Sequence, residues 1–420
     1  MWNRLLDRFL RRFVRKGSLT LTLPDGQTRI YGDGSTPQVT LTLHDPALPR
    51  KLVMDPDLAL GEGYMDGRLS VRNDDVNALL ALALSNQRAG HMRGWQAMLM
   101  RLRARLRFLT QFNPTGRARR NVAHHYDLSG ELYDLFLDSD RQYSCAYFRN
   151  PDDSLELAQA RKKAHIAAKL RLKPGMRVLD IGCGWGGMAL SLARDHGVEV
   201  LGITLSQEQL ATARARARDA GLDGQVRFGL TDYRAVTGTF DRVVSVGMFE
   251  HVGAPQFRSY FRTLRSHLAP DGLALIHTIG RSAPPGTTSR WITKYIFPGG
   301  YIPAMSEIMA EVERERLVPC DIEVWRLHYA ETLRHWHARF MANIDTARAL
   351  YDDRFCRMWR YYLAASEESF RHAGLCVFQF QLAHHVAAAP ITRDYLYADR
   401  SNQAPAADPV PADVARSAAE

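Results

Sequence analysis

From about residue 160 onward, short apolar runs alternate with stretches of helical periodicity. The apolar runs predict five buried strands, and the stretches between them predict helices near 188–195, 206–220 and 256–268. Strands that alternate with helices are typical of an α/β fold around a parallel sheet, which binds ligands at the carboxyl ends of its strands. The predicted strands are 177–181, 198–204, 226–230, 240–246 and 273–279.

After the fifth strand the alternation stops. The block 281–332 interrupts it and has room for a lid or a substrate-binding insertion. Long helices follow to about Ala373, and the apolar run 376–382 predicts a last strand. The stretch 387–420 is rich in Ala, Pro and Asp, a composition that predicts a disordered tail.

The first 110 residues have a different pattern. Alternating runs such as 19–23 and 39–43, separated by turn residues, predict a small half-buried sheet within 18–72, and a helix follows near 77–84. Residues 2–15 predict an amphipathic helix with bulky apolar groups on one face and arginines on the other. Such a helix lies on an anionic membrane, or it packs on its own protein with solvated arginines. We therefore expect a smaller mixed α+β domain over 1–110.

The formal net charge of +10 predicts an acidic partner, either nucleic acid or anionic lipid. From His91 to Arg120 there is no acidic residue, while apolar residues repeat at helical spacing. This second basic amphipathic segment favours a lipid surface over nucleic acid. Pro114 and Gly116 break the pattern, so we expect a linker at 111–121.

Other features bear on the compartment. No run of eighteen apolar residues predicts a transmembrane helix, and the N-terminus has no secretory signal. The five cysteines are scattered, which indicates reduced thiols, and His124–His125 lack a third metal ligand at suitable spacing. We expect no metal and a cytoplasmic protein that is peripherally associated with the inner face of the membrane.

The segment Val178–Gly187 carries the strongest chemical signal. An apolar run meets one carboxylate and then glycines in the spacing G-x-G-x-G-G, which differs from the dinucleotide fingerprint. A carboxylate against a glycine turn suits a nucleoside with a positive charge, such as S-adenosylmethionine. The alternative is a glycine turn that serves packing alone. The candidate cosubstrate residues here are Asp180, Gly182, Cys183, Gly184, Trp185 and Gly186.

Loops after the next two strands converge on the same edge. Thr204, Leu205, Ser206 and Gln209 are candidates for the ribose, although Ser206 with Gln209 also fits a capping box. Asp232 and Tyr233 are candidates for the adenine. The alternative for Asp232 is a helix N-cap.

The loops after the fourth and fifth strands are expected at the opening of the predicted cosubstrate site, where a substrate would enter. They bring Glu250 and His277 toward the place where a substrate meets the sulfonium methyl. Glu250 is the candidate base, whereas we expect His251 to be solvated.

Several short sequence segments of this chain resemble those of the cyclopropane-fatty-acyl-phospholipid synthases, a family that includes the mycolic acid cyclopropane synthases. The resemblance covers about 120–385 and extends more loosely to 1–110. It implies a Rossmann-like class I S-adenosylmethionine-dependent methyltransferase domain over 122–386. The matching segments are 124–128 (HHYDL), 135–138 (LFLD), 143–148 (YSCAYF), 179–187 (LDIGCGWGG), 245–253 (SVGMFEHVG) and 277–280 (HTIG).

The resemblance also implies an activity. Family members use S-adenosylmethionine to add a methylene across a cis double bond of a phospholipid acyl chain, and they hold a bicarbonate ion. By resemblance, Tyr143 and Ser144 meet the cosubstrate, and the N-terminal region binds lipid headgroups or a second subunit in a homodimer. The implied bicarbonate ligands are Cys145, Glu250, His277, the Ile279 backbone and Tyr329.

One position departs from the family pattern. Many members have a cysteine in the late helix where this chain has Ser366, so Ser366 receives no catalytic role. A fatty-acyl C-methyltransferase on the same fold is the alternative enzyme. The more distant alternatives are a nucleic-acid methyltransferase, suggested only by the basic charge, and a lipid-surface binding protein with a relic methyltransferase domain.

Overall fold

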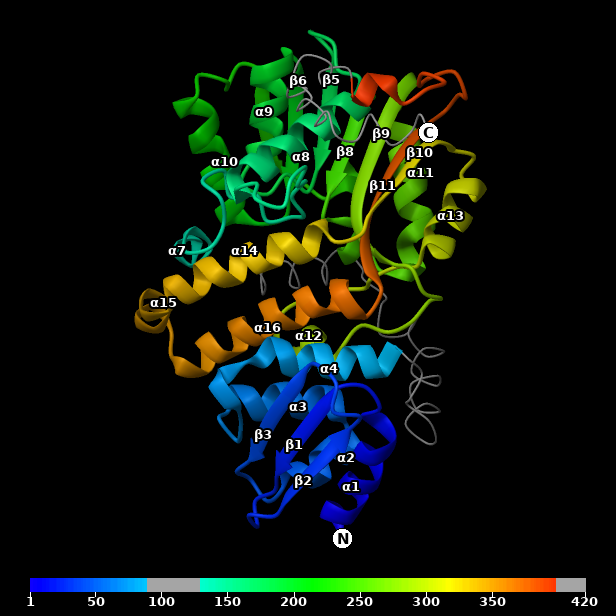
Figure 1. Cartoon of the computed structure of the whole chain (residues 1–420). Coiled ribbons are helices and arrows are strands. Elements are labelled where there is room, and N and C mark those ends of the chain that lie inside the picture. The colour runs from blue at the N-terminus through cyan, green and yellow to red at the C-terminus, as the bar shows by residue number, and fades with distance from the viewer. Residues whose placement is uncertain (89–128, 398–420) are drawn as a thin grey trace, which may run out of the picture.

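The computed structural model describes residues 1–88 and 129–397 (Figure 1). A four-stranded sheet near the N-terminus has the order β2-β1-β3-β4, and a seven-stranded sheet has the order β10-β11-β9-β8-β5-β6-β7. Two long helices, α14 (His328–Ala342) and α16 (Asp353–His372), lie between the two sheets. The N-terminal sheet therefore reaches the larger one through a helical layer.

Six strands of the seven-stranded sheet follow the predicted apolar runs, and the edge strand β10 does not. Neighbours pair in parallel from β7 through β6, β5 and β8 to β9, whereas β11 pairs antiparallel with β9 and with β10. The order β8-β5-β6-β7 places four strand ends side by side at one edge. The bounds are β5 Arg177–Ile181, β6 Glu199–Thr204, β7 Val226–Leu230, β8 Phe240–Val246, β9 Leu268–Arg281, β10 Val318–Trp325 and β11 Leu375–Ala383.

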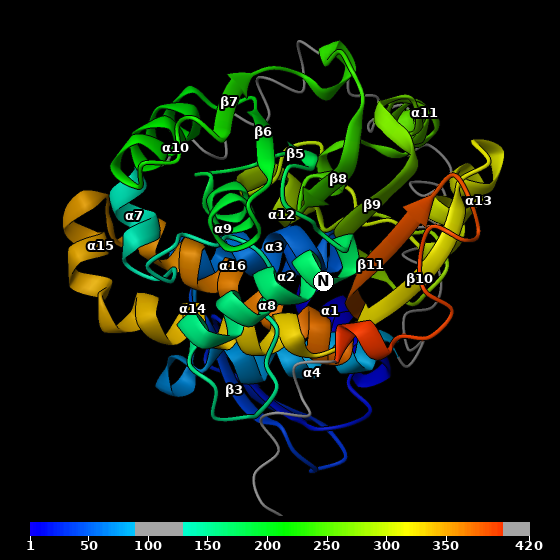
Figure 2. The ribbon, with the colours of Figure 1, turned by 90° about the horizontal axis from the view of Figure 1, so that it is seen from above.

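Helices cover both faces of this sheet (Figure 2). One face carries α8 (Leu155–Leu170), α9 (Gly187–His196) and α10 (Gln207–Asp219), and the other carries α11 (Phe257–His267) and α13 (Met305–Arg314). Because both faces are covered, the central strands are buried throughout, which explains their continuous apolar runs. The α/β prediction is confirmed.

The prediction that residues 281–332 form an insertion outside the sheet is partly wrong. This segment does hold α12 (Arg290–Tyr295) and α13, but it also contributes β10 to the sheet. This strand lies at the sheet edge, where polar residues such as Asp321 and Glu323 are tolerated. Its sequence therefore lacks the apolar run that revealed the central strands.

The N-terminal domain combines strands and helices as expected. Its sheet comprises β1 (Ser18–Thr22), β2 (Thr28–Gly32), β3 (Gln38–Leu43) and β4 (Leu69–Val71). Buried leucines alternate with half-buried threonines along β1 and β3. The predicted small sheet within 18–72 is therefore confirmed, but the prediction missed two helices in the same range. These are α2 (Leu48–Met54) and α3 (Pro56–Met65), and α4 (Val76–Arg88) extends the helix expected near 77–84.

The first helix, α1 (Trp2–Phe13), packs on its own domain. Leu6 is 1% exposed, and Trp2 and Phe9 pack against the same core. Arg4 and Arg8 are exposed on the opposite face. The alternative in which the helix packs on its own protein is therefore confirmed for the apolar face, and the basic face remains open to a partner.

Two other predicted segments need comment. The basic stretch 91–120, the linker 111–121 and His124–His125 lie outside the described residues. The predicted tail begins too early, because Leu396 is buried and the Tyr395 hydroxyl donates to Gln381 Oε1 at 3.2 Å. None of the helices in the described ranges combines the length and the apolar content that a membrane span needs.

Candidate active site

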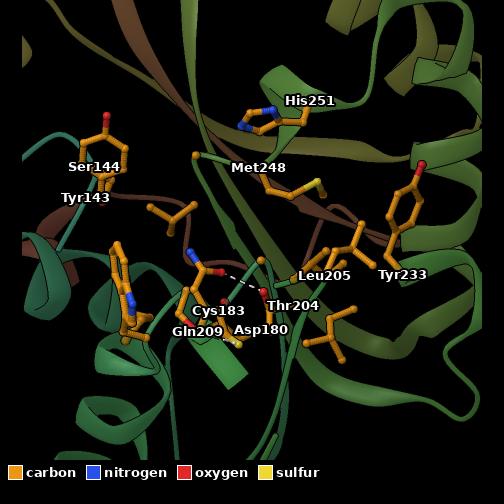
Figure 3. Close-up of a pocket in the computed structure, with 18 of the residues that line it drawn as sticks. Tyr143, Ser144, Asp180, Cys183, Thr204, Leu205, Gln209, Tyr233, Met248 and His251 are labelled. Atoms are coloured by element: carbon orange, nitrogen blue, oxygen red, sulfur yellow. Dashed lines mark hydrogen bonds between the residues drawn. The ribbon is translucent and has the colours of Figure 1, made fainter. Parts of the chain in front are cut away.

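A cavity opens where β5, β6, β7 and β8 end, as the parallel topology predicts (Figure 3). Tyr143 lies at one end of the view and Tyr233 at the other, with Asp180 and Thr204 between them. Of the predicted cosubstrate residues, those that line the cavity are Tyr143, Ser144, Asp180, Gly182, Cys183, Gly184, Trp185, Thr204, Leu205, Gln209, Asp232 and Tyr233.

The glycine turn after β5 brings backbone to the cavity. Gly182 has a φ of 85°, and a Cβ there would lie 2.8 Å from Met248 Cβ, so any larger residue is excluded. The turn is held by the N–H groups of Gly182 and Cys183, which donate to Ile203 O at 2.9 and 3.0 Å. Gly186 was predicted to bind cosubstrate, but it does not line the cavity. A Cβ there would lie 2.7 Å from Phe228, so packing explains this glycine.

The segment after β6 is held by its own hydrogen bonds. Thr204 Oγ1 donates to Gln209 Oε1 at 2.8 Å and accepts from Ser206 N at 3.1 Å (Figure 3). Ser206 caps α10 by accepting from Gln209 N at 3.3 Å, and it does not line the cavity. The capping role of Ser206 is therefore confirmed, and its cosubstrate role is not. The bond from Thr204 also fixes the orientation of the Gln209 amide.

The segment after β7 contains a residue that the sequence did not reveal. Asp232 caps a short helix by accepting from Arg234 N at 3.0 Å. Arg234 Nε and Nη2 also donate to its two carboxylate oxygens, each at 2.7 Å. The predicted N-cap role of Asp232 is therefore confirmed; it also lines the cavity, and its role toward the adenine stays a prediction. Arg234 lines the cavity beside it and neutralises its charge.

Asp180 is the least satisfied group in the wall. It is 1% exposed, and its Oδ2 has no hydrogen-bond partner among the described residues. Burial raises the pKa of this carboxyl to about 7. A buried carboxylate with an open oxygen suits a cationic ligand group.

Tyr143 and Ser144 enter the wall from the segment before α8. The Tyr143 hydroxyl lies 2.8 Å from the Tyr362 hydroxyl on α16, and its ring stacks on Trp336 of α14 at 5.2 Å. Ser144 Oγ accepts from Lys162 Nζ at 2.8 Å. The helical layer therefore positions this end of the cavity.

Behind the cavity wall, Glu250 is held by the strand that carries His277. Ile279 N donates to Glu250 Oε1 at 2.6 Å, so this backbone N–H already has a partner. Glu250 Oε2 is buried and has none among the described residues, and burial raises the pKa of the carboxyl to about 7. His277 Nδ1 accepts from Gln379 Nε2 at 3.1 Å, and burial holds its pKa well below the usual value.

Cys145 and Tyr329 complete the predicted set. Cys145 is wholly buried, which raises the pKa of its thiol. Tyr329 lies on α14 with its ring 5.8 Å from the Trp336 ring. None of the five predicted catalytic residues lines the cavity, although Cys145 directly follows Ser144, and Glu250 directly precedes His251, in its wall.

His251 is a correction to the sequence prediction. It lines the cavity instead of being solvated, and burial lowers the pKa of its imidazole to about 4. Figure 3 shows it across the cavity from Asp180 and Gln209. Pro298, from the insertion, also lines the wall, whereas Ser366 on α16 does not. The sequence did contain a signal for His251. It follows Glu250 in the loop after β8, and the strand order places that loop at the cavity.

Two family models match the chain. A model described as mycolic acid cyclopropane synthetase matches residues 114–380. A second, described as a domain of unknown function (DUF7884), matches residues 5–92. Together they account for both sheets.

The chain is also similar to curated proteins over most of its length. A cyclopropane-fatty-acyl-phospholipid synthase from Escherichia coli strain K12 is 39% identical over 351 residues, covering 83% of this chain and 88% of that protein. A probable fatty acid methyltransferase from Pseudomonas putida is 36% identical over 405 residues, covering 90% and 96%.

Among solved structures, two are similar over the larger domain. The cyclopropane synthase MmaA2 from Mycobacterium tuberculosis has a TM-score of 0.61 at 31% identity, covering 65% of this chain and 99% of that one. The mycolic acid cyclopropane synthase CmaA1 complexed with SAH and CTAB has a TM-score of 0.60 at 32% identity, with the same coverage. SAH is what remains of S-adenosylmethionine after methyl transfer.

Proposed function

Because the chain belongs to the mycolic acid cyclopropane synthetase family and is an S-adenosylmethionine-dependent methyltransferase of that family, we propose that it is a cyclopropane fatty acid synthase. It transfers a methylene group to the cis double bond of an unsaturated phospholipid acyl chain. The observation that carries this proposal is the half-satisfied carboxylate of Glu250, the residue that directly precedes His251 in the wall of the cavity.

The reaction needs one methyl transfer and one proton loss. An alkene carbon attacks the methyl group, the S–CH₃ bond breaks to leave a thioether, and the neighbouring carbon becomes a cation. When a proton leaves the transferred methyl group, the electron pair of that C–H bond closes the ring. A buried acceptor near the cosubstrate is therefore required, and in this proposal Glu250 Oε2, which is buried without a hydrogen-bond partner among the described residues, takes up the departing proton by way of a bound bicarbonate ion.

Bicarbonate belongs to this proposal, and the chemistry of the predicted ligands fits it. Glu250 Oε2 suits the anion's O–H, and the neutral His277 imidazole and the Tyr329 hydroxyl are of the donor type that the anion needs; the Cys145 thiol donates to Ala146 O at 3.4 Å and would have to turn toward the anion. The Ile279 N–H is engaged by Glu250, so its part is to orient that carboxylate. When bound, the anion supplies a base for the proton of the transferred methyl group.

The test uses purified full-length protein, S-adenosylmethionine and vesicles of a cis-monounsaturated phospholipid. Released acyl chains are analysed by gas chromatography with mass detection, before and after mild catalytic hydrogenation. A ring and an exocyclic methylene both add CH₂, but only the methylene then takes up hydrogen and gains two mass units. We expect the added CH₂ without hydrogen uptake.

The second candidate is a fatty-acyl C-methyltransferase. It is favoured by the similarity to the Pseudomonas putida protein over 90% of this chain and by Ser366 at the late-helix position. A product that gains the mass of CH₂ and then takes up hydrogen would select this alternative over ring formation.

The proposal also includes an anionic membrane surface as the partner. The basic face of α1 supports it, because Arg4, Arg8 and Arg12 are exposed while the apolar face packs on the protein. Reversing these three charges to Glu should weaken sedimentation with anionic vesicles, and the same reversal of Arg218, Arg227 and Arg265, which are exposed elsewhere on the surface, is the matched control. Equal loss in both variants would contradict a specific role of α1. The homodimer stays a prediction.

A further inference from the structure

A wholly buried lysine lies directly beneath the cavity wall. Lys162 on α8 is 0% exposed, and its Nζ donates to Gln142 Oε1 at 2.7 Å and to Ser144 Oγ at 2.8 Å. Within residues 1–88 and 129–397, no carboxylate lies within ion-pair distance of it; Asp138 and Asp140 act on it only from farther away. A buried ammonium without an ionic partner is costly, so its retention needs a reason.

This ammonium fixes what Ser144 presents to the cavity. A lysine ammonium has only donors, so Ser144 Oγ accepts its bond and the hydroxyl proton must point elsewhere. No acceptor among the described residues takes that proton. Gln142 is fixed in the same way, because its Oε1 is used by Lys162 and its Nε2 donates to Asp140 Oδ2 at 3.0 Å. Both Ser144 and Gln142 line the cavity. This part of the wall therefore presents hydrogen-bond donors to a ligand, and the Lys162 ammonium lies behind them.

The strand order shows which part of the cosubstrate meets this wall. Asp232 and Tyr233, the adenine candidates, follow β7, and the ribose candidate Thr204 ends β6. The amino-acid end of S-adenosylmethionine then lies over β5 and β8, and Figure 3 places Tyr143 and Ser144 at the end of the view away from Tyr233. That end carries an ammonium and a carboxylate. The open oxygen of Asp180 suits the ammonium, which leaves the carboxylate for Ser144.

We infer that Lys162 is a positioning residue that recognises the carboxylate of the cosubstrate through Ser144. It turns the serine hydroxyl toward the carboxylate and adds a positive charge behind it, without touching the ligand itself. A charge-assisted arrangement of this kind is stronger than a neutral hydrogen bond. The inference rests on the cosubstrate of the proposed function but not on its acyl substrate, so binding measurements alone can test it.

The test compares S-adenosylmethionine with its decarboxylated analogue, which keeps the adenosine, sulfonium and ammonium. Both are titrated calorimetrically into wild type and Lys162→Met. We expect the variant to bind S-adenosylmethionine about tenfold more weakly, the usual size for losing a hydrogen bond to a charged group, and the analogue within twofold of wild type. In turnover, KM for S-adenosylmethionine should rise while kcat stays within about threefold. An equal loss for both ligands, or no loss for either, would overturn the inference.

Two further variants keep the test decisive. Lys169→Met removes another wholly buried lysine of α8, whose Nζ pairs with Glu323 Oε2 at 2.6 Å, and it should leave the affinity ratio of the two ligands unchanged. Ser144→Ala removes the hydroxyl through which Lys162 acts and should lose S-adenosylmethionine selectively. If Lys162→Met fails to fold, Ser144→Ala with an unchanged affinity ratio is enough to reject the inference.

Discussion

The cavity wall and the group behind it differ in how their polar atoms are satisfied. In the wall, Thr204 is bonded to Gln209 and Asp232 to Arg234 before any ligand arrives, while Asp180 keeps one open oxygen that suits a cationic ligand group. The candidate catalytic cluster that the family resemblance implies, Glu250, His277 and Cys145, does not line the cavity; it has an open carboxylate oxygen, and burial shifts the pKa values of its imidazole and thiol toward their neutral forms. A preorganised wall favours binding, whereas an unsatisfied cluster is available for chemistry. The two regions should therefore respond differently to substitution.

The largest effect is expected at Glu250. Glu250→Gln keeps the size of the side chain but removes the proton acceptor, so product formation should fall by about 10²–10⁴-fold, the usual contribution of a general base. Affinity for S-adenosylmethionine should stay within about twofold, because Glu250 does not line the cavity. Label transfer from methyl-labelled cosubstrate measures the first quantity and calorimetry the second.

The matched control is Glu368→Gln on α16. Glu368 is also buried with a raised pKa, but its Oε1 accepts from Asn77 of the N-terminal domain at 3.0 Å. It should retain turnover within a few-fold. If Glu250→Gln lost cosubstrate affinity as severely as turnover, the separation of wall and cluster would be wrong.

The next effect concerns the wall itself. Gly182→Ala forces a Cβ against Met248 and onto a backbone with φ of 85°, so cosubstrate affinity should fall by about 30–100-fold, consistent with about 2–3 kcal/mol of local strain. Gly221→Ala is the control, because it also has a positive φ but nothing within 4 Å. Equal losses of affinity in the two variants would show that the approach to Met248 is irrelevant.

A smaller effect is expected at Thr204. Thr204→Val removes the bonds to Gln209 and to the backbone of Ser206, which should weaken S-adenosylmethionine binding about five- to tenfold, the size of one neutral hydrogen bond or slightly more. Turnover at saturating cosubstrate should be nearly unchanged. A fall in saturated turnover larger than the fall in affinity would place Thr204 with the chemistry and not with the wall.

The last effect concerns stability instead of binding or turnover, and it is a pH dependence at Asp180 that should change the melting temperature by only a few degrees. Its pKa rises from the ordinary value near 4 to about 7 on folding, so its contribution to the stability of the ligand-free protein is full below about pH 4 and is lost as pH rises through 7. Asp180→Asn should therefore melt at nearly the wild-type temperature at pH 5 and a few degrees higher at pH 8. Melting curves across this range provide the check, and a difference that shrinks as pH rises would contradict it.

The wall was predictable from sequence because it is built from strand ends. The buried strand β5 gives a continuous apolar run, so the position of Asp180 and Gly182 followed from the pattern alone. Gly186 and Ser206 lie in the same segments, but their local packing and capping became visible only with Phe228 and Gln209 beside them. Sequence spacing does not distinguish a glycine that faces a ligand from one that faces a phenylalanine.

Other parts could not be predicted for physical reasons. The edge strand β10 carries Asp321 and Glu323, which pair with buried Lys169 on α8, and this long-range pairing leaves no local signal. Lys162 in the same helix stands between Arg161 and Lys163, and nothing in that local sequence shows that it is buried. Its burial follows from the packing of α8 behind the cavity, which depends on the whole sheet.

The most direct test of this account follows the hydrogens of the transferred methyl group. Wild-type protein is incubated with cis-monounsaturated phospholipid vesicles and with S-adenosylmethionine whose transferable methyl group is CD₃. The mass of the acyl product is then measured by mass spectrometry. Proton loss from the transferred methyl predicts a chain that has gained CD₂ and lost none of its own hydrogens. A product that keeps CD₃ and has lost one chain hydrogen would contradict the proposed role of the cluster.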